Sequence, residues 1–119
     1  MSVWAKGLIA LVALLHLGFL VMEMFLWTTP TIRASFGLTE EFARQSRSLA
    51  ANQGLYNGFL AAGLIWSLVA SAPLGRPLAF FFLGCVVVAG VFGAFTAKMS
   101  ILFVQALPAV LALVAVILS

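Results

Sequence analysis

Charged residues are scarce in this sequence, and acidic residues are the scarcest. Only 8% of its 119 residues are charged, with six Lys or Arg against three Asp or Glu. Soluble domains contain about one quarter charged residues, so this composition is typical of a membrane protein. No basic cluster accompanies the formal net charge of +3. That excludes a nucleic-acid surface and favours contact with anionic lipid head groups.

Cysteine and histidine occur once each, which excludes several kinds of site. Cys85 lies alone in an apolar run, so there is no disulfide framework and no CxxC motif. Nucleophile elbows, phosphate loops, HExxH and a Ser-His-Asp order are absent too, which excludes soluble hydrolase or kinase chemistry. His16 alone makes no metal site. We therefore expect no metal, and no cofactor unless His16 ligates a haem.

Long apolar runs take the place of charge. Hydrophobic residues make up 65% of the chain, and its mean hydropathy is +1.23. Because a helix crosses a bilayer in about 20 residues, the length accommodates four spans and no separate soluble domain. The predicted fold is all-α, a four-transmembrane-helix bundle over residues 1–119. Its spans are predicted at residues 4–27, 46–71, 78–97 and 101–118.

A short interfacial helix is predicted between spans one and two. Thr29 and Pro30 form a typical N-cap and first helical residue, and Gly37 marks the end of this helix. The next helix begins after Thr39, where two acids complement the helix dipole, and is expected to continue unbroken into span two. Residues 72–77, rich in helix breakers, are predicted to form a turn.

The basic residues give an expected orientation. Cytoplasmic loops carry an excess of Lys and Arg. The loop after span one and the turn before span four carry Arg33, Arg44, Arg47 and Lys98, against Lys6 and Arg76 on the opposite side. Both termini are therefore expected outside the cytoplasm. The chain itself is expected in the inner (cytoplasmic) membrane of a bacterium.

A cluster of polar residues interrupts span two. Polar side chains in hydrocarbon are costly unless they are paired, so such a cluster usually faces a bundle interior or a cavity. The cluster occupies an arc of about 140° on one helix face. A GxxxG pair on the other side offers a smooth contact surface. The four polar residues are Asn52, Gln53, Tyr56 and Asn57, and the glycines are Gly54 and Gly58.

Spans one and four contribute further polar candidates. Glu23 and His16 are seven residues apart and share a face of span one. A carboxyl group in lipid favours its protonated form, so Glu23 is the main candidate for a functional site, with simple solvation at the interface as the alternative. His16 is a haem ligand, a proton relay or a hydrogen-bonded core residue. In span four, Pro108 frees a backbone acceptor near Gln105.

The sequence also resembles a family of small bacterial and fungal membrane proteins known only as a domain of unknown function. The matching segments are residues 16–30, 49–63 and 103–108, and Ala-Asn-Gln-Gly-Leu-Tyr-Asn-Gly is the most specific stretch. The resemblance implies a four-helix membrane protein and no established activity. In architecture alone, the chain is similar to small multidrug exporters and to small haem-bearing epoxide isomerases.

These features lead to one main functional hypothesis and two alternatives. We expect a polar pocket that binds or transports a small polar or amphipathic molecule, with Glu23 as the protonatable site. The lining residues are expected to be Glu23, Asn52, Gln53, Tyr56, Asn57 and Gln105. One alternative is a membrane-embedded enzyme, isomerase-like and haem-dependent if His16 is a ligand. The other is a structural subunit. Expected partners are membrane lipids, the small molecule and further copies of the chain, associated through the glycine faces.

Overall fold

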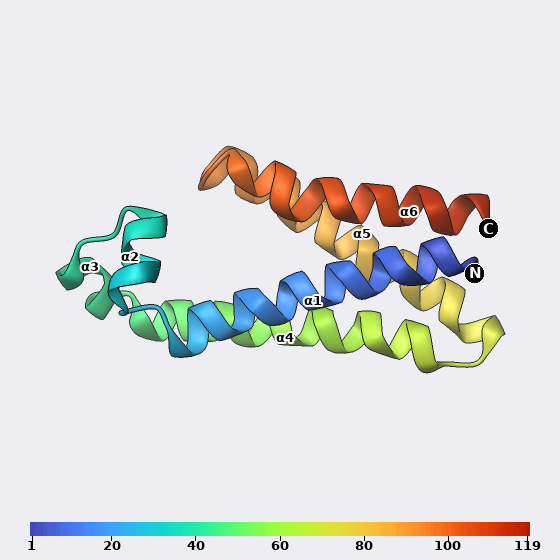
Figure 1. Cartoon of the computed structure of the whole chain (residues 1–119), viewed down its shortest axis with the longest axis horizontal. Helices are drawn as coiled ribbons and strands as arrows, with labels where there is room; N and C mark the ends of the chain where they lie inside the picture. The colour runs from blue at the N-terminus through green and yellow to red at the C-terminus, as the bar shows by residue number, and fades with distance from the viewer. The chain divides into compact units, whose positions relative to one another are not determined.

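The computed structural model describes residues 1–119, and every regular element in it is helical (Figure 1). The elements are α1 (Val3–Phe25), α2 (Pro30–Phe36), α3 (Glu40–Gln45), α4 (Arg47–Val69), α5 (Ala72–Thr96), the π-helical turn η1 (Leu102–Ala106) and α6 (Leu107–Leu118). They form two compact units, one of residues 16–59 and one of residues 1–15 and 60–119. The all-α prediction is confirmed.

Two helices are long and apolar enough to cross a membrane. They are α1, with 23 residues, and α5, with 25. The segment Leu102–Leu118 is apolar but shorter, and α4 has 23 residues but contains the polar cluster. Two of the four predicted spans therefore have both the length and the apolarity of a membrane helix.

Small residues bring the helices of the larger unit close together. A Cβ atom added to Gly90 would lie 2.8 Å from the Ala106 backbone nitrogen, and one on Gly93 would lie 3.2 Å from Ile101. At the other end of α5, Arg76 donates a hydrogen bond to the Ser119 carbonyl at 2.9 Å. These pairings run in opposite directions along the two helices, so α5 and α6 are antiparallel (Figure 1).

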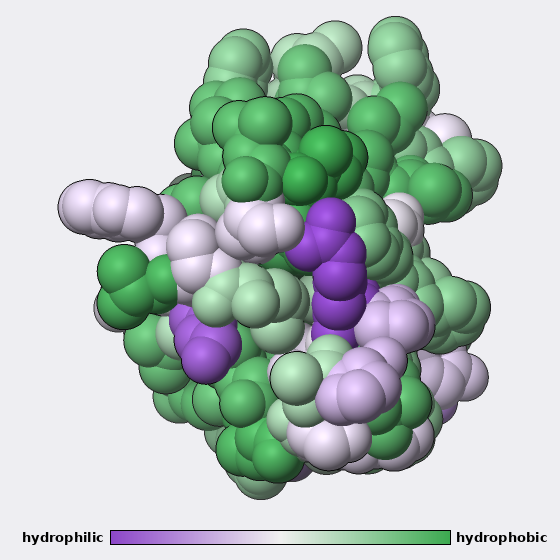
Figure 2. Space-filling view, turned by 90° about the vertical axis from the view of Figure 1, so that its right-hand side faces the viewer, coloured by the Kyte–Doolittle hydropathy of each residue, from purple (hydrophilic) through white to green (hydrophobic).

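The core of this unit is made of alanines and a few larger aliphatic residues. Its fully buried large side chains are Ile9, Val12, Leu64, Leu83, Val86 and Val116. In the whole chain, 33 large apolar side chains are exposed. Figure 2 shows apolar residues covering much of one face of the molecule. The chain therefore buries small residues between helices and presents large apolar ones to its surroundings.

The predicted unbroken helix into span two is interrupted at Ser46. Helix α3 ends there, and Ser46 has φ −92° and ψ 3°. Its hydroxyl donates to the Phe42 carbonyl at 2.7 Å and accepts a hydrogen bond from Trp27 Nε1 at 3.0 Å. A serine side chain that bonds back to a carbonyl in the preceding turn tends to bend a helix. The Trp27 contact holds this bend in place.

The predicted turn over residues 72–77 is also wrong, because α5 begins at Ala72. The reversal is confined to residues 70 and 71. Pro73 lies in the first helical turn, where its missing N–H would have no partner in any case. Pro77 lies one turn further on, inside the helix. Both prolines are thus accommodated near the start of α5 instead of before it.

The short helix between the first two long helices is confirmed. Helix α2 spans Pro30–Phe36 and ends at Gly37, which has φ 66°. Only a residue without a side chain adopts this left-handed conformation freely. Thr39 caps α3 by accepting a hydrogen bond from the Phe42 amide at 3.1 Å. These local signals were sufficient to predict both helix starts.

A comparison of two glycines tests the α5 packing. Gly90→Ala places a Cβ against the backbone of Ala106, so the helices must separate, and we expect the free energy of unfolding to fall by about 1–3 kcal/mol. At Gly84 a Cβ would meet nothing within 4 Å. Gly84→Ala should therefore be neutral or stabilising by up to about 1 kcal/mol. Denaturation in detergent measures both, and equal effects would contradict the close contact.

Candidate functional site

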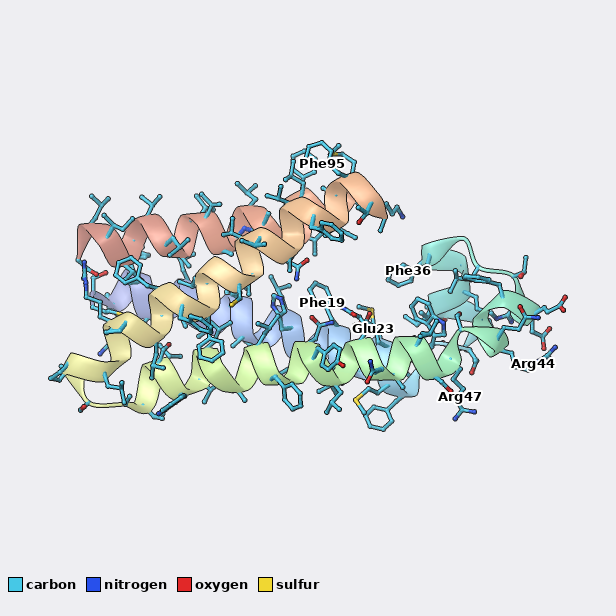
Figure 3. All side chains as sticks on the ribbon, turned by 180° about the vertical axis from the view of Figure 1, so that it is seen from behind. Phe19, Glu23, Phe36, Arg44, Arg47 and Phe95 are labelled. Atoms are coloured by element: carbon cyan, nitrogen blue, oxygen red, sulfur yellow. The ribbon has the colours of Figure 1, made fainter.

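The candidate site depends on the contact between α1 and α4 in the unit of residues 16–59. A Cβ atom on Gly54 would lie 2.7 Å from Met24 Cγ, 3.1 Å from Glu23 Cβ and 3.2 Å from the Leu20 carbonyl oxygen. One on Gly58 would lie 2.7 Å from Leu20 Cδ1. The GxxxG face of α4 therefore packs directly on α1, and it brings Glu23 beside α4 (Figure 3).

Glu23 and Asn57 meet at this contact. Asn57 Nδ2 donates a hydrogen bond to Glu23 Oε1 at 2.5 Å. Asn57 is buried, with 6% of its surface exposed, and Glu23 is half-buried. The donor is a neutral amide, so the bond leaves the charge of an ionised Glu23 unneutralised. A charged carboxylate at this position would need a proton or an added cation to become neutral.

Aromatic residues flank Glu23 in the sequence. Phe19 lies one turn before Glu23 on α1 and therefore shares its side of the helix, whereas Trp27 lies in the turn after α1 ends. The Phe19 ring meets His16 edge-on at 5.2 Å, and Trp27 packs on Phe36 of α2 at 5.4 Å. In Figure 3, Phe19 and Phe36 are seen on the same side of this helix pair as Glu23. The carboxyl group thus has largely apolar neighbours along its own helix.

The other polar residues of α4 lie on its outer side. Asn52, Gln53 and Tyr56 are all exposed, and Tyr56 has 49% of its surface accessible. Around an ideal helix Asn57 is about 60° from Gly54, whereas Asn52 is about 160° away from it. Of the four polar residues on the predicted arc, only Asn57, at one edge, therefore enters the contact with α1. The structure brings Glu23 and Asn57 together and leaves the other three on the outer side of α4.

The two remaining predicted residues are His16 in α1 and Gln105 in η1. His16 is completely buried. Gln105 is half-buried in η1. At the end of this turn the Leu107 amide donates a hydrogen bond to the Leu102 carbonyl, five residues earlier, as in a π-helix. This irregular turn precedes Pro108, where the sequence predicted a disturbed helix. No three His, Cys, Asp or Glu side chains are grouped closely enough to hold a metal ion.

The hydrogen bond between Trp27 and Ser46 was not predicted from the sequence. It links the end of α1 to the start of α4, and α2 and α3 lie between these two residues in the chain. Within this segment Ile32 and Ala43 are buried, whereas Phe42 and Arg44 are exposed. A tryptophan near the end of a span is typical of a position at the membrane interface. No pattern in the sequence identified its partner 19 residues later.

The fold and the site describe an all-helical protein in which an acidic side chain on one long helix accepts a hydrogen bond from another long helix. Comparison with known families makes this more specific. The family described as "Protein of unknown function (DUF1304)" matches residues 10–117, and the chain belongs to it. The predicted resemblance to a domain of unknown function is therefore confirmed. The matched region contains both Glu23 and Asn57. No curated protein and no solved structure matches the chain.

A double-mutant cycle tests the Glu23–Asn57 pair. Asn57→Leu removes the donor and should lower the free energy of unfolding by about 1–3 kcal/mol. Replacing both residues with leucine should cost less than the sum of the single changes, because no buried polar group remains unpaired. We expect a coupling energy of about 0.5–2 kcal/mol in detergent denaturation.

The exposed Gln53→Leu serves as the control, with an expected change within about 0.5 kcal/mol. A coupling energy of zero between positions 23 and 57 would show that the hydrogen bond does not form.

Proposed function

We propose that this chain is a four-span integral membrane protein that binds or transports a small polar or amphipathic molecule at the Glu23–Asn57 pair. Glu23 is the protonatable site, and the bound molecule competes with the proton for it. One observation carries the proposal: an acidic side chain in a long apolar helix, hydrogen-bonded to a neutral amide. The site lies within the region shared with the family.

The exposed apolar surface supports a place in a membrane. Monomeric soluble proteins rarely expose large contiguous apolar patches, yet 33 large apolar side chains are exposed here. Two helices have the length and composition of spans. We assign the third span to α4, which matches α1 in length, and the fourth to Leu102–Leu118, whose 17 residues are near the lower limit of about 17 for a spanning helix.

The basic residues support an orientation within this proposal. Arg44 and Arg47 are exposed at the junction of α3 and α4, and Arg33 is half-buried in α2. Under the positive-inside rule this segment lies at the cytoplasmic face of a bacterial inner membrane, with both termini on the other side. Glu23 then lies near the cytoplasmic end of its helix, where a proton can be exchanged with water.

The chemistry of the pair supports a ligand with a positive charge or a strong hydrogen-bond donor. An ionised carboxylate in an apolar setting is stabilised by a proton, a cation or several donors. Asn57 supplies one donor and holds Oε1 in place. Gln53 lies one turn before Asn57 and is exposed, so its amide is available to the polar part of a bound molecule.

A purely structural role is the second candidate, and the same contact favours it. The Glu23–Asn57 hydrogen bond lies beside the close approach of α1 at Gly54, where helix-bridging polar residues often occur in membrane proteins. The two roles differ in one respect. A structural bridge requires only an acceptor at position 23, whereas the proposed function requires an ionisable one.

Glu23→Gln separates the two roles, because glutamine still accepts the Asn57 hydrogen bond but cannot ionise. Protein purified in mild detergent is analysed by native mass spectrometry at several pH values between about 5 and about 8. We expect a small-molecule adduct on the wild type, with pH-dependent occupancy. Occupancy should fall at least about tenfold in Glu23→Gln with an unchanged unfolding temperature.

Glu41→Gln is the matched control, because Glu41 is exposed on α3 and should leave the adduct unchanged. A wild type without an adduct, or a Glu23→Gln variant that keeps the adduct and its pH dependence, would favour the structural role. A visible absorption spectrum of the same sample tests the haem alternative. A Soret band that disappears in His16→Ala would replace the proposal with a haem enzyme.

A further inference from the structure

The outer side of α4 carries a row of exposed side chains with the spacing of a helix-pairing surface. The row consists of Leu49, Asn52, Tyr56 and Phe59, spaced three, four and three residues apart. Leu49 is 74% exposed, Tyr56 49% and Phe59 58%, and Asn52 is exposed as well. This is the spacing of the a and d positions through which two helices pack. We call this row the α4 seam.

We propose that a second copy of the chain packs on the α4 seam, with the two α4 helices parallel around a two-fold axis. The inference rests on the membrane location in the proposed function, but not on the ligand. In a two-fold interface each residue near the axis meets its own copy. An asparagine has both donors and an acceptor, so Asn52 can pair with Asn52 of the second copy.

The identity of Asn52 favours a second copy over other occupants. In parallel helix pairs a single asparagine at a contact position fixes the register and the number of strands. Asn52 is the only amide in the seam, with apolar or aromatic residues before and after it. In a membrane an exposed amide at this place would face hydrocarbon, which is costly without a partner. A self-complementary pair removes that cost without any additional molecule.

The GxxxG face of α4 and the Gly90–Gly93 surface of α5 are not free to form this interface. Gly54 and Gly58 pack on α1, whereas Gly90 and Gly93 pack on Ala106 and Ile101. Gly63, the next position of the seam after Phe59, is covered by Phe82. Association through the glycines would therefore require these internal contacts to break. The α4 seam needs no such change, and it ends where Phe82 covers the helix.

The seam and the candidate site can operate independently. Asn52 and Asn57 are five residues apart, which places them about 140° apart around α4. Asn57 is therefore turned toward α1 while Asn52 is turned away from it, in agreement with their burial. Two copies can join through the seam without disturbing the Glu23–Asn57 hydrogen bond.

Cysteine cross-linking in membranes tests the interface. Single cysteines are introduced along residues 49–59 in the full chain, after the native thiol has been removed by Cys85→Ala. On oxidation we expect disulfide-linked dimers to peak at positions 49, 52, 56 and 59. Leu111→Cys, on the exposed side of α6, serves as the control and should give at least about fivefold less dimer. An even profile, a peak outside the seam or equal cross-linking at position 111 would overturn the proposal.

A second variant tests the role of the amide. Asn52→Leu keeps the approximate size of the side chain and makes it apolar, which suits lipid, but it removes the hydrogen bond, so dimer affinity measured by energy transfer in vesicles should fall about 5- to 30-fold. Gln53→Leu, at the same depth but outside the seam, should change it less than about threefold.

Glu23→Gln should leave the cross-linking profile unchanged. A dimer without an adduct would contradict only the ligand proposal, and a monomer with an adduct would contradict only this one.

Discussion

The approach of α1 to α4 at Gly54 is the constraint on which the candidate site depends. The nearest backbone atom to a Cβ at this position would be the Leu20 carbonyl oxygen, at 3.2 Å. The Met24 side chain can turn aside, but the Leu20 oxygen can yield only if the helix backbone moves by a few tenths of an ångström, so the contact favours glycine. With the helices this close, a short asparagine side chain reaches the carboxyl group of Glu23. The same approach also occupies the GxxxG face, so any partner must bind elsewhere on α4.

Much of the fold follows from local signals in the sequence. Thr29 and Pro30 start α2, Gly37 ends it and Thr39 starts α3, because the backbone requirements at these positions involve only neighbouring residues. The bend at Ser46 is different, since its hydroxyl is held by Trp27 from another part of the chain. The prediction of a turn over residues 72–77 failed for a further reason. Prolines near the start of a helix and prolines in a turn have the same composition, and only the backbone distinguishes them.

Glu23 and Asn57 were both among the residues singled out in the sequence, but their pairing was not predicted. The helical wheel correctly grouped the four polar residues of α4 on one arc, but it could not decide which side of the arc faces α1. Gly54 decides this, because its close contact with α1 fixes the buried direction. Asn57, about 60° from that direction, is buried, whereas Asn52, about 160° away, is exposed. Pairing between helices 34 residues apart in sequence leaves no local pattern from which it could be inferred.

An acid at position 23 is the feature that separates the proposed function from simple helix adhesion. Glutamine at this position would accept the same hydrogen bond from Asn57 and would carry no charge that must be neutralised in an apolar setting. Adhesion alone therefore gives no physical reason for glutamate. A reversible charge does give one, because a carboxyl group can exchange a proton for a bound cation or donor at the same oxygen atoms. On α4, the inward amide Asn57 holds one oxygen of this group, and the outward amide Asn52 is the contact residue of the proposed dimer.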